Sequence, residues 1–116
     1  MPPMSEFLVV LVTTPDSATS EKIAEALVSE RLAACVNIVP SIQSIYRWEG
    51  EINRDPESLM IVKTTRDRYE ALENRVRQLH GYSTPEVIAI EIESGSSDYL
   101  RWLADSVSTK NDARGE

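Results

Sequence analysis

The chain has 116 residues and a formal net charge of −7, from 12 Lys and Arg against 19 Asp and Glu. This length accommodates one domain, and a hydrophobic content of 41% supplies a core that needs no disulfides. The acidic balance argues against a partner that is a nucleic acid or an anionic membrane, because binding to either relies on a basic protein surface.

The apolar runs and the cysteine count indicate where the protein resides. The longest apolar run, residues 7–12, has six residues, whereas a membrane-spanning helix needs about 20. Cys35 is the only cysteine, so an intramolecular disulfide is excluded. The first residues lack the basic segment and long apolar stretch of a secretory signal. We therefore expect a cytosolic protein with no membrane span.

The first predicted elements are a strand and a helix. Residues 7–12 are short, apolar and rich in β-branched side chains, which is typical of a buried central strand. Pro15 followed by Asp16 and Ser17 is a helix-start signature, and the helix is expected to end near Leu32. The residues that recur there at helical spacing are Ser20, Ile23, Ala24, Leu27 and Val28.

A long hairpin is predicted next. Its first arm covers residues 33–48 and is expected to be interrupted by Pro40, because proline cannot donate to a central strand ladder. Gly50 marks a tight turn, since glycine readily takes the positive φ that a short hairpin requires. The second arm covers residues 51–64 and is expected to break at Pro56.

A second helix, a fourth strand and a short third helix complete the prediction. Thr64 or Thr65 caps the second helix, and Gly81 stands where a left-handed C′ glycine is expected. The buried stripe of this helix is predicted to consist of Tyr69, Leu72, Val76 and Leu79.

The fourth strand is predicted at residues 87–92. It places Ile88, Ile90 and Ile92 on one face, and Glu91 and Glu93 on the other.

The third helix begins near residues 96–98 and carries Leu100 and Leu103. Residues 107–116 are polar and expected to be frayed.

This order of elements predicts an α+β protein with the ferredoxin-like split βαβ fold. Two crossover helices cover one face of a four-stranded antiparallel sheet, with a short C-terminal helix and a long hairpin between the second and third strands. We expect a single domain over residues 1–116, ordered from about residue 6 to 106. The hairpin tip, with Tyr46 and Trp48, and the open sheet face would expose a large apolar surface in a monomer. Self-association would cover both surfaces.

Five segments carry a family resemblance: RLAACVNI, IYRWEGEI, KTT, HGYSTPE and DYLRWL, at residues 31–38, 45–52, 63–65, 80–86 and 98–103. Together they resemble the CutA (divalent-cation tolerance) family over about residues 6–106. The resemblance implies a compact homotrimer, similar in fold to the signalling protein PII, whose hairpin arms reach the neighbouring subunit. It also implies a link to tolerance of copper and other divalent cations, without an established catalytic reaction.

His80 and Cys35 are the candidate metal ligands. His80 is the only histidine, and a neutral imidazole is a good copper ligand. The alternative is a helix-terminal histidine whose charged form is favoured by the helix dipole. Some members of the resembled family use for copper a cysteine matching Val12 and a second histidine matching Leu79, and both are aliphatic here. We therefore expect weak, pH-dependent copper binding through His80.

Cys35 has two interpretations. A thiolate is soft enough for copper(I), but one thiol makes a poor site. Free cysteine more often packs as a small hydrophobic side chain, and we favour core packing.

A second candidate site combines Tyr46, Trp48, Lys63, Tyr82 and Glu86. The resemblance brings the Trp48 hairpin and the loop of Tyr82 and Glu86 close to a subunit boundary. Lys63 lies in an apolar strand and needs a partner, for which Glu86 is the candidate. The set forms either a cleft for a small-molecule ligand or an inter-subunit aromatic anchor with a structural ion pair. We favour the anchor.

Enzyme motifs are missing from the sequence. It has no glycine-rich phosphate loop, no Gly-x-Ser-x-Gly, no Cys-x-x-Cys and no His-Glu-x-x-His. We predict a non-catalytic cytosolic homotrimer of the divalent-cation (copper) response. One alternative is a PII-like sensor that binds an anionic small molecule at subunit clefts, although the chain lacks a basic, glycine-bearing loop. Another is a structural or interaction scaffold.

Overall fold

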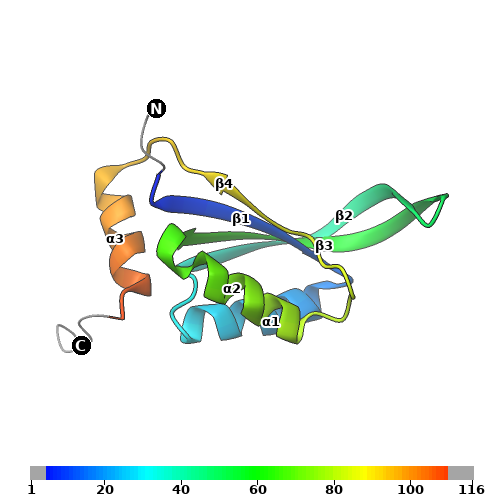
Figure 1. The fold of residues 1–116 in the computed structure, drawn as a ribbon, viewed down its shortest axis with the longest axis horizontal. Coiled ribbons are helices and arrows are strands. Elements are labelled where there is room, and N and C mark those ends of the chain that lie inside the picture. Colours follow the sequence, from blue (N-terminus) through cyan, green and yellow to red (C-terminus); the bar gives the residue numbers. More distant parts are fainter. Residues whose placement is uncertain (1–4, 110–116) are drawn as a thin grey trace.

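Short runs rich in β-branched and other apolar residues form the strands, and apolar residues at helical spacing form the helices. The computed structural model describes residues 5–109. Within this range the elements are β1 (Phe7–Thr14), α1 (Ser17–Ser29), β2 (Cys35–Trp48), β3 (Glu51–Thr65), α2 (Arg66–Leu79), β4 (Val87–Glu91) and α3 (Ser97–Val107). The four strands make an antiparallel sheet in the order β2-β3-β1-β4 (Figure 1). The predicted ferredoxin-like α+β fold is confirmed.

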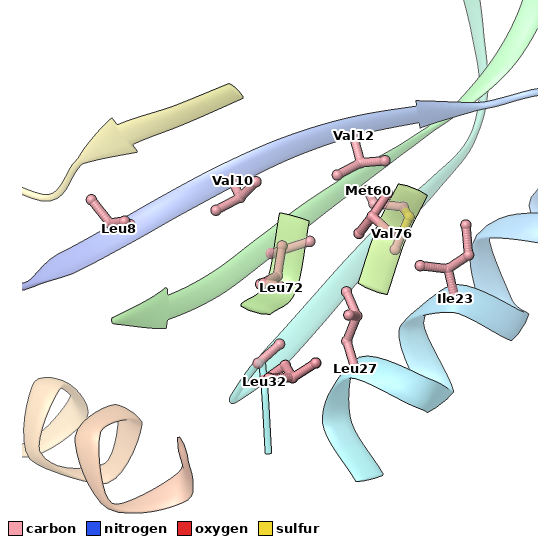
Figure 2. Packing of buried hydrophobic residues seen from close by; sticks show 11 residues of the cluster. Leu8, Val10, Val12, Ile23, Leu27, Leu32, Met60, Leu72 and Val76 are labelled. Carbon is pink, nitrogen blue, oxygen red and sulfur yellow. The ribbon is translucent and has the colours of Figure 1, made fainter. Parts of the chain in front are cut away.

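The main core lies between the sheet and helices α1 and α2 (Figure 1). Residues paired across an antiparallel ladder share a face of the sheet. The pairs Val10–Val62 and Val12–Met60 therefore lie on the same face. Each fully buried side chain of this size contributes roughly 1.5–3 kcal/mol of transfer free energy. Figure 2 shows the side chains of Val10, Val12 and Met60 on the side of the sheet that the helices cover. The helices contribute Ile23 and Leu27 from α1, and Leu72 and Val76 from α2.

Helix α1 begins where the sequence predicts and ends earlier. The Asp16 carboxylate accepts a hydrogen bond from the Thr19 backbone N–H at 2.8 Å, which caps the first turn. The helix stops at Ser29, and Arg31 takes a φ of 61°, which reverses the chain before Leu32. Val28, predicted to belong to the apolar stripe, lies on the exposed side of the helix.

Both hairpin strands extend through their prolines. Strand β2 lies at the sheet edge, and its pairing with β3 shifts register between Val39 and Ile42, so the predicted interruption at Pro40 is present as a bulge within a continuous strand. The predicted break at Pro56 is wrong, because Pro56 pairs with Gln43 within β3. Strand β1 ends opposite Ser58, so Pro56 of β3 has a neighbouring strand on one side only. Both prolines therefore occupy edge positions.

The predicted tight turn is present, and it ends a hairpin that projects well beyond the sheet. Glu49 and Gly50 have φ values of 52° and 82°, the two positive angles of a turn that suits the twist of a hairpin. The molecule is elongated, 50 × 35 × 21 Å, and the hairpin tip lies at the end opposite α3 (Figure 1). Beyond Ser58 the hairpin has no third strand to support it.

Both ends of α2 and the C-terminal end of α3 differ from what the sequence predicts. Thr65 is the N-cap of α2, but its hydroxyl donates to the Asp67 carboxylate and makes no bond with the helix backbone. Gly81 does not take a positive φ, because the chain leaves the helix in extended conformation already at His80. Val107, expected in a frayed tail, is only 3% exposed at the end of α3; residues 110–116 lie outside the described part.

The sheet face that points away from α1 and α2 is apolar along β4. Ile88 and Ile90 pair with Leu11 and Val9 on this face, as the predicted alternation requires. They are 50% and 51% exposed. Helix α3 contacts β3 and buries Leu103 outside the main core cluster. A large apolar area therefore remains open to solvent in the single chain.

Candidate functional site

A cleft lies between the projecting hairpin and the loop that joins α2 to β4, and its hairpin lining extends from Glu57 to Trp48 beside the turn. Its volume is about 570 Å³, within the range of small-molecule sites. Three aromatic rings, two carboxylates and several hydroxyls surround it. The lining residues are Thr13, Ser44, Ile45, Tyr46, Trp48, Glu57, Tyr82, Ser83, Thr84 and Glu86.

Two tyrosine–carboxylate pairs organise this cleft. The Tyr46 hydroxyl donates to the Asp55 carboxylate across the hairpin, and the Tyr82 hydroxyl donates to Glu57 Oε2 at 3.0 Å. Tyr46, Asp55 and Glu57 share one side of the hairpin, because cross-strand partners point to the same face and alternate residues along a strand do too. The loop that carries Tyr82 is thereby tied to β3.

Both phenols have a pKa above the ordinary value of tyrosine, and the main cause differs between them. Burial is the largest cause that raises the pKa of Tyr82 to about 12, followed by its hydrogen bond to Glu57 and the charge of that carboxylate. The hydrogen bond to Asp55 is the main cause that raises the pKa of Tyr46. Both hydroxyls therefore remain hydrogen-bond donors at neutral pH.

His80 lies behind the cleft and uses both ring nitrogens within the protein. It is 8% exposed, and its Nε2 lies 2.7 Å from the Thr13 carbonyl oxygen. Its Nδ1 accepts the Tyr82 backbone N–H at 3.1 Å, which assigns the ring proton to Nε2. The rings of His80 and Tyr82 lie 4.7 Å apart, centroid to centroid. This histidine positions the cleft loop and leaves no ring nitrogen free for the predicted copper ion.

Cys35 and Lys63 lie together on the sheet face away from the main core. They are cross-strand partners, with the Lys63 ammonium 3.8 Å from the Cys35 sulfur and hydrogen-bonded to the Asn37 side chain. Cys35 is half-buried there, so the predicted core packing is wrong. Lys63 does not line the cleft, and the predicted ion pair with Glu86 is not formed. The period-two alternation of β3 turns Lys63 away from the helices.

The structure thus brings together four of the five residues of the second candidate site, Tyr46, Trp48, Tyr82 and Glu86. The sequence reasoning missed Asp55 and Glu57, which stand beside the expected break at Pro56. Their i, i+2 spacing in the sequence would have predicted two carboxylates on the same face of one strand. The described lining residues include no Lys, Arg or His.

Residues 5–109 contain neither a cluster of metal ligands nor a membrane-spanning helix. In that range no three His, Cys, Asp or Glu residues lie close enough to share a metal ion. The helices within the same residues are too short or too polar to cross a bilayer.

Comparisons with known proteins agree with the fold. Residues 8–106 match the family model of the CutA1 divalent ion tolerance protein. The chain is 51% identical over 98 residues to the divalent-cation tolerance protein CutA of Thermus thermophilus, covering 84% of this chain and 95% of that protein. It is 48% identical over 99 residues to the chloroplastic protein CutA of Arabidopsis thaliana, covering 85% of this chain but 54%, about half, of that protein.

A solved structure gives the same result. The divalent cation tolerance protein (Cut A1) of Thermus thermophilus superposes with a TM-score of 0.85 at 50% sequence identity. The superposition covers 86% of this chain and 97% of the other. The residues matched by the family model, 8–106, run from β1 to α3 and include the long hairpin.

Proposed function

The chain belongs to the CutA1 divalent ion tolerance family, and on this basis we propose that it acts as a non-catalytic homotrimer in the cellular response to divalent cations, including copper. The observation that supports assembly most directly is the apolar surface left open by the single chain. Ile52 and Trp48 on the hairpin are 62% and 50% exposed, and the open sheet face adds Ile88 and Ile90.

The hairpin itself favours a ring of subunits. One of its faces carries Tyr46, Trp48 and Asp55, whereas the other carries Arg47 and Arg54 with aliphatic neighbours. Two faces of opposite charge on one arm suit a heterologous contact, in which each subunit offers a different face to each neighbour. Such contacts close into a ring when the rotation between subunits allows it, as a trimer requires. Tyr46 and Trp48 are the proposed aromatic anchors.

The proposed copper contact is weak. Copper(II) prefers several nitrogen or oxygen donors in a tetragonal arrangement. His80 is held by two backbone groups, and the Cys35 sulfur lies beside the Lys63 ammonium. We propose that neither residue anchors a specific copper site in one subunit.

The cleft chemistry disfavours the PII-like alternative. An anionic metabolite would meet Glu57 and Glu86 without a lining Lys, Arg or His to neutralise it. The proposed location is the cytosol, in agreement with the single free cysteine. Relatives and solved structures carry names that include chloroplastic and periplasmic forms, so fractionation of the native cells is the test of this location.

Native mass spectrometry with and without copper(II) tests assembly and metal binding together. The expected result is a trimer at micromolar concentration whose copper adducts do not saturate at one ion per subunit. A parallel titration of His80→Gln should show the same weak copper binding as the wild type. A monomer would overturn the proposed assembly. Tight copper binding by the wild type that is lost in His80→Gln would show that His80 is a copper ligand after all.

A further inference from the structure

We propose that three buried hydroxyl side chains, those of Thr14, Ser20 and Ser58, fix the direction in which the hairpin leaves the sheet and thereby position it for assembly. These three residues are called the hydroxyl chain below. The inference rests on the proposed homotrimer and adds residues that hold its arm in place without belonging to the contact surface. All three are 0% exposed within one subunit, so a neighbouring copy has no surface of theirs to cover.

The hydroxyl chain lies where the sheet narrows to the hairpin. Strand β1 ends at Thr14, which pairs with Ser58, and beyond Ser58 only β2 and β3 continue (Figure 1). The pairing of β2 with β3 shifts register at the same level, between Val39 and Ile42. A bulge bends its strand and increases the local twist, so the direction of the hairpin is set at this point.

Hydrogen bonds join the three hydroxyls across three elements. The Ser20 hydroxyl of α1 lies 2.7 Å from the Thr14 hydroxyl of β1 and 2.9 Å from the Ser58 hydroxyl of β3. At one end of the chain, Thr14 Oγ1 donates to the Asp16 carbonyl at 2.7 Å. At the other end, Ser58 Oγ lies 3.3 Å from the Val39 carbonyl oxygen of β2. The base of the hairpin is therefore bonded to the first turn of a helix that packs on the sheet.

The number of protons gives the hydroxyl chain a direction. Its three hydroxyls supply three protons for four oxygen–oxygen contacts, so one contact holds no proton. Hydrogen bonds between hydroxyls are commonly about 2.7–2.8 Å long, and the contact of Ser58 with Val39 is the longest of the four at 3.3 Å. The protons therefore run from Ser58 through Ser20 and Thr14 to the Asp16 carbonyl. Hydrogen bonds ordered in one direction polarise and strengthen one another.

The length of the hairpin makes a small change at its base large at its tip. Residues 51–58 of β3 extend over roughly 25 Å, at about 3.3 Å per residue. A change of about 10° in direction at Ser58 would move the tip by about 4 Å over this length. Apolar atoms are in contact only within about 4.0–4.5 Å, so such a shift would displace Trp48 from its proposed contact with a neighbour.

Subunit exchange measures the effect on assembly. Isotope-labelled and unlabelled protein are mixed at a temperature where the wild type exchanges over hours, and native mass spectrometry follows the mixed trimers. Ser58→Ala and Ser20→Ala should each exchange about tenfold faster than the wild type, the factor that corresponds to one net hydrogen bond. Each change removes one oxygen atom and leaves the other two hydroxyls with an acceptor, so both variants should fold.

The double variant distinguishes one shared bond from two independent effects. Ser20 and Ser58 act through the same contact, so the variant that combines Ser20→Ala and Ser58→Ala should exchange no faster than either single variant. An acceleration equal to the product of the two single effects would overturn the proposal.

Thr64→Val is the matched control. The Thr64 side chain is also fully buried and donates to the Leu32 carbonyl at 2.7 Å, so this change removes a similar hydrogen bond from β3. Thr64 lies roughly 20 Å along the strand from Ser58, on the side away from the hairpin. Thr64→Val should therefore lower the free energy of unfolding without changing subunit exchange. Equal acceleration in Thr64→Val, or none in Ser20→Ala and Ser58→Ala, would show that the hydroxyl chain does not position the hairpin.

A second readout separates this inference from the proposed assembly. The chain has two tryptophans, so in a Trp102→Phe background the fluorescence anisotropy of Trp48 reports the motion of the hairpin. If the wild type is a monomer, Ser58→Ala should lower this anisotropy and Thr64→Val should not. A monomer with that difference defeats only the assembly. A trimer whose subunit exchange is the same in Ser58→Ala as in the wild type defeats only this inference.

Discussion

At the scale of single residues, His80 is the side chain that links β1 to the cleft loop. Its ring spans the Thr13 carbonyl and the Tyr82 N–H in a nearly buried position. Removing the ring leaves both backbone groups without this partner, and an unsatisfied buried polar group costs about 1–3 kcal/mol.

We therefore predict that His80→Ala lowers the free energy of unfolding by about 1–3 kcal/mol, measured by urea denaturation. Asn74→Ala, an exposed change on α2, should stay within about 0.5 kcal/mol of the wild type. Equal stability of wild type and His80→Ala would contradict the structural role. The variant should also lose order in the loop of Tyr82, which hydrogen exchange of that amide reports.

Tyr82 gives a prediction about pH. Its folded-state pKa of about 12 lies above the ordinary value of 10.0, so the folded protein holds this proton more tightly than the unfolded chain does. The resulting stability is complete below pH 10 and is lost as the pH rises through about 12. An ultraviolet titration of tyrosinate should show that Tyr82→Phe removes a group that ionises near pH 12.

Glu57 contributes to the raised pKa of Tyr82, so a change at Glu57 tests the cause of that shift. Glu57→Gln removes the charge beside the Tyr82 phenol and should lower its pKa part of the way, because burial, the largest cause, remains. Glu70→Gln, which removes the same charge from an exposed position of α2, is the matched control and should leave the titration unchanged. A Tyr82 pKa that stays at about 12 in Glu57→Gln would show that the carboxylate has no influence.

At the scale of elements, the hairpin is the least supported part of the described chain and carries its most exposed large apolar side chains. We predict that Trp48→Ala weakens assembly by about 2–4 kcal/mol per contact, the effect of truncating a buried aromatic anchor. Sedimentation over a concentration series measures the shift toward smaller species. Val28→Ala, which shortens an exposed apolar residue on α1, should not change assembly. Indistinguishable profiles for wild type and Trp48→Ala would remove Trp48 from the interface.

The two prolines show how the position of a strand overrides its composition. Pro40 and Pro56 are poor residues for a central strand, and the sequence alone gives no strand order. The order β2-β3-β1-β4 places β2 at an edge, and the end of β1 leaves the outer part of β3 with one neighbour. Both prolines are then tolerated, and the hairpin strands continue through them.

At the scale of the whole molecule, the proposed non-catalytic role predicts no turnover. The purified protein should not hydrolyse generic esters, phosphate esters or nucleotides above the rate of buffer. The physical reason is that catalysis of these reactions needs a positioned nucleophile and base, and His80, the only histidine, is held by backbone groups. Activity that copurifies with the protein and disappears in Glu57→Gln or Glu86→Gln would contradict this expectation.

Local physical chemistry made much of the fold predictable from the sequence. Three features depend on neighbours a few residues away: the apolar composition of β1, the Asp16 cap and the Gly50 turn. The exposed aromatic residues of the hairpin were also foreseeable, because an unsupported two-stranded ribbon has no core to bury them. These features need no knowledge of which strand lies beside which.

Tertiary structure decided the features that depend on distant partners. His80 looked like a metal ligand until the fold placed Thr13 against one ring nitrogen and the Tyr82 backbone against the other. Lys63 was paired with Glu86 on the basis of charge, but the face it occupies in β3 is set by the sheet register, which turns it toward Asn37. The sequence by itself determined the family, the order of the elements and the exposed aromatic residues of the hairpin. Only the packed sheet determined which side chains share a cleft, because cross-strand neighbours are far apart along the chain.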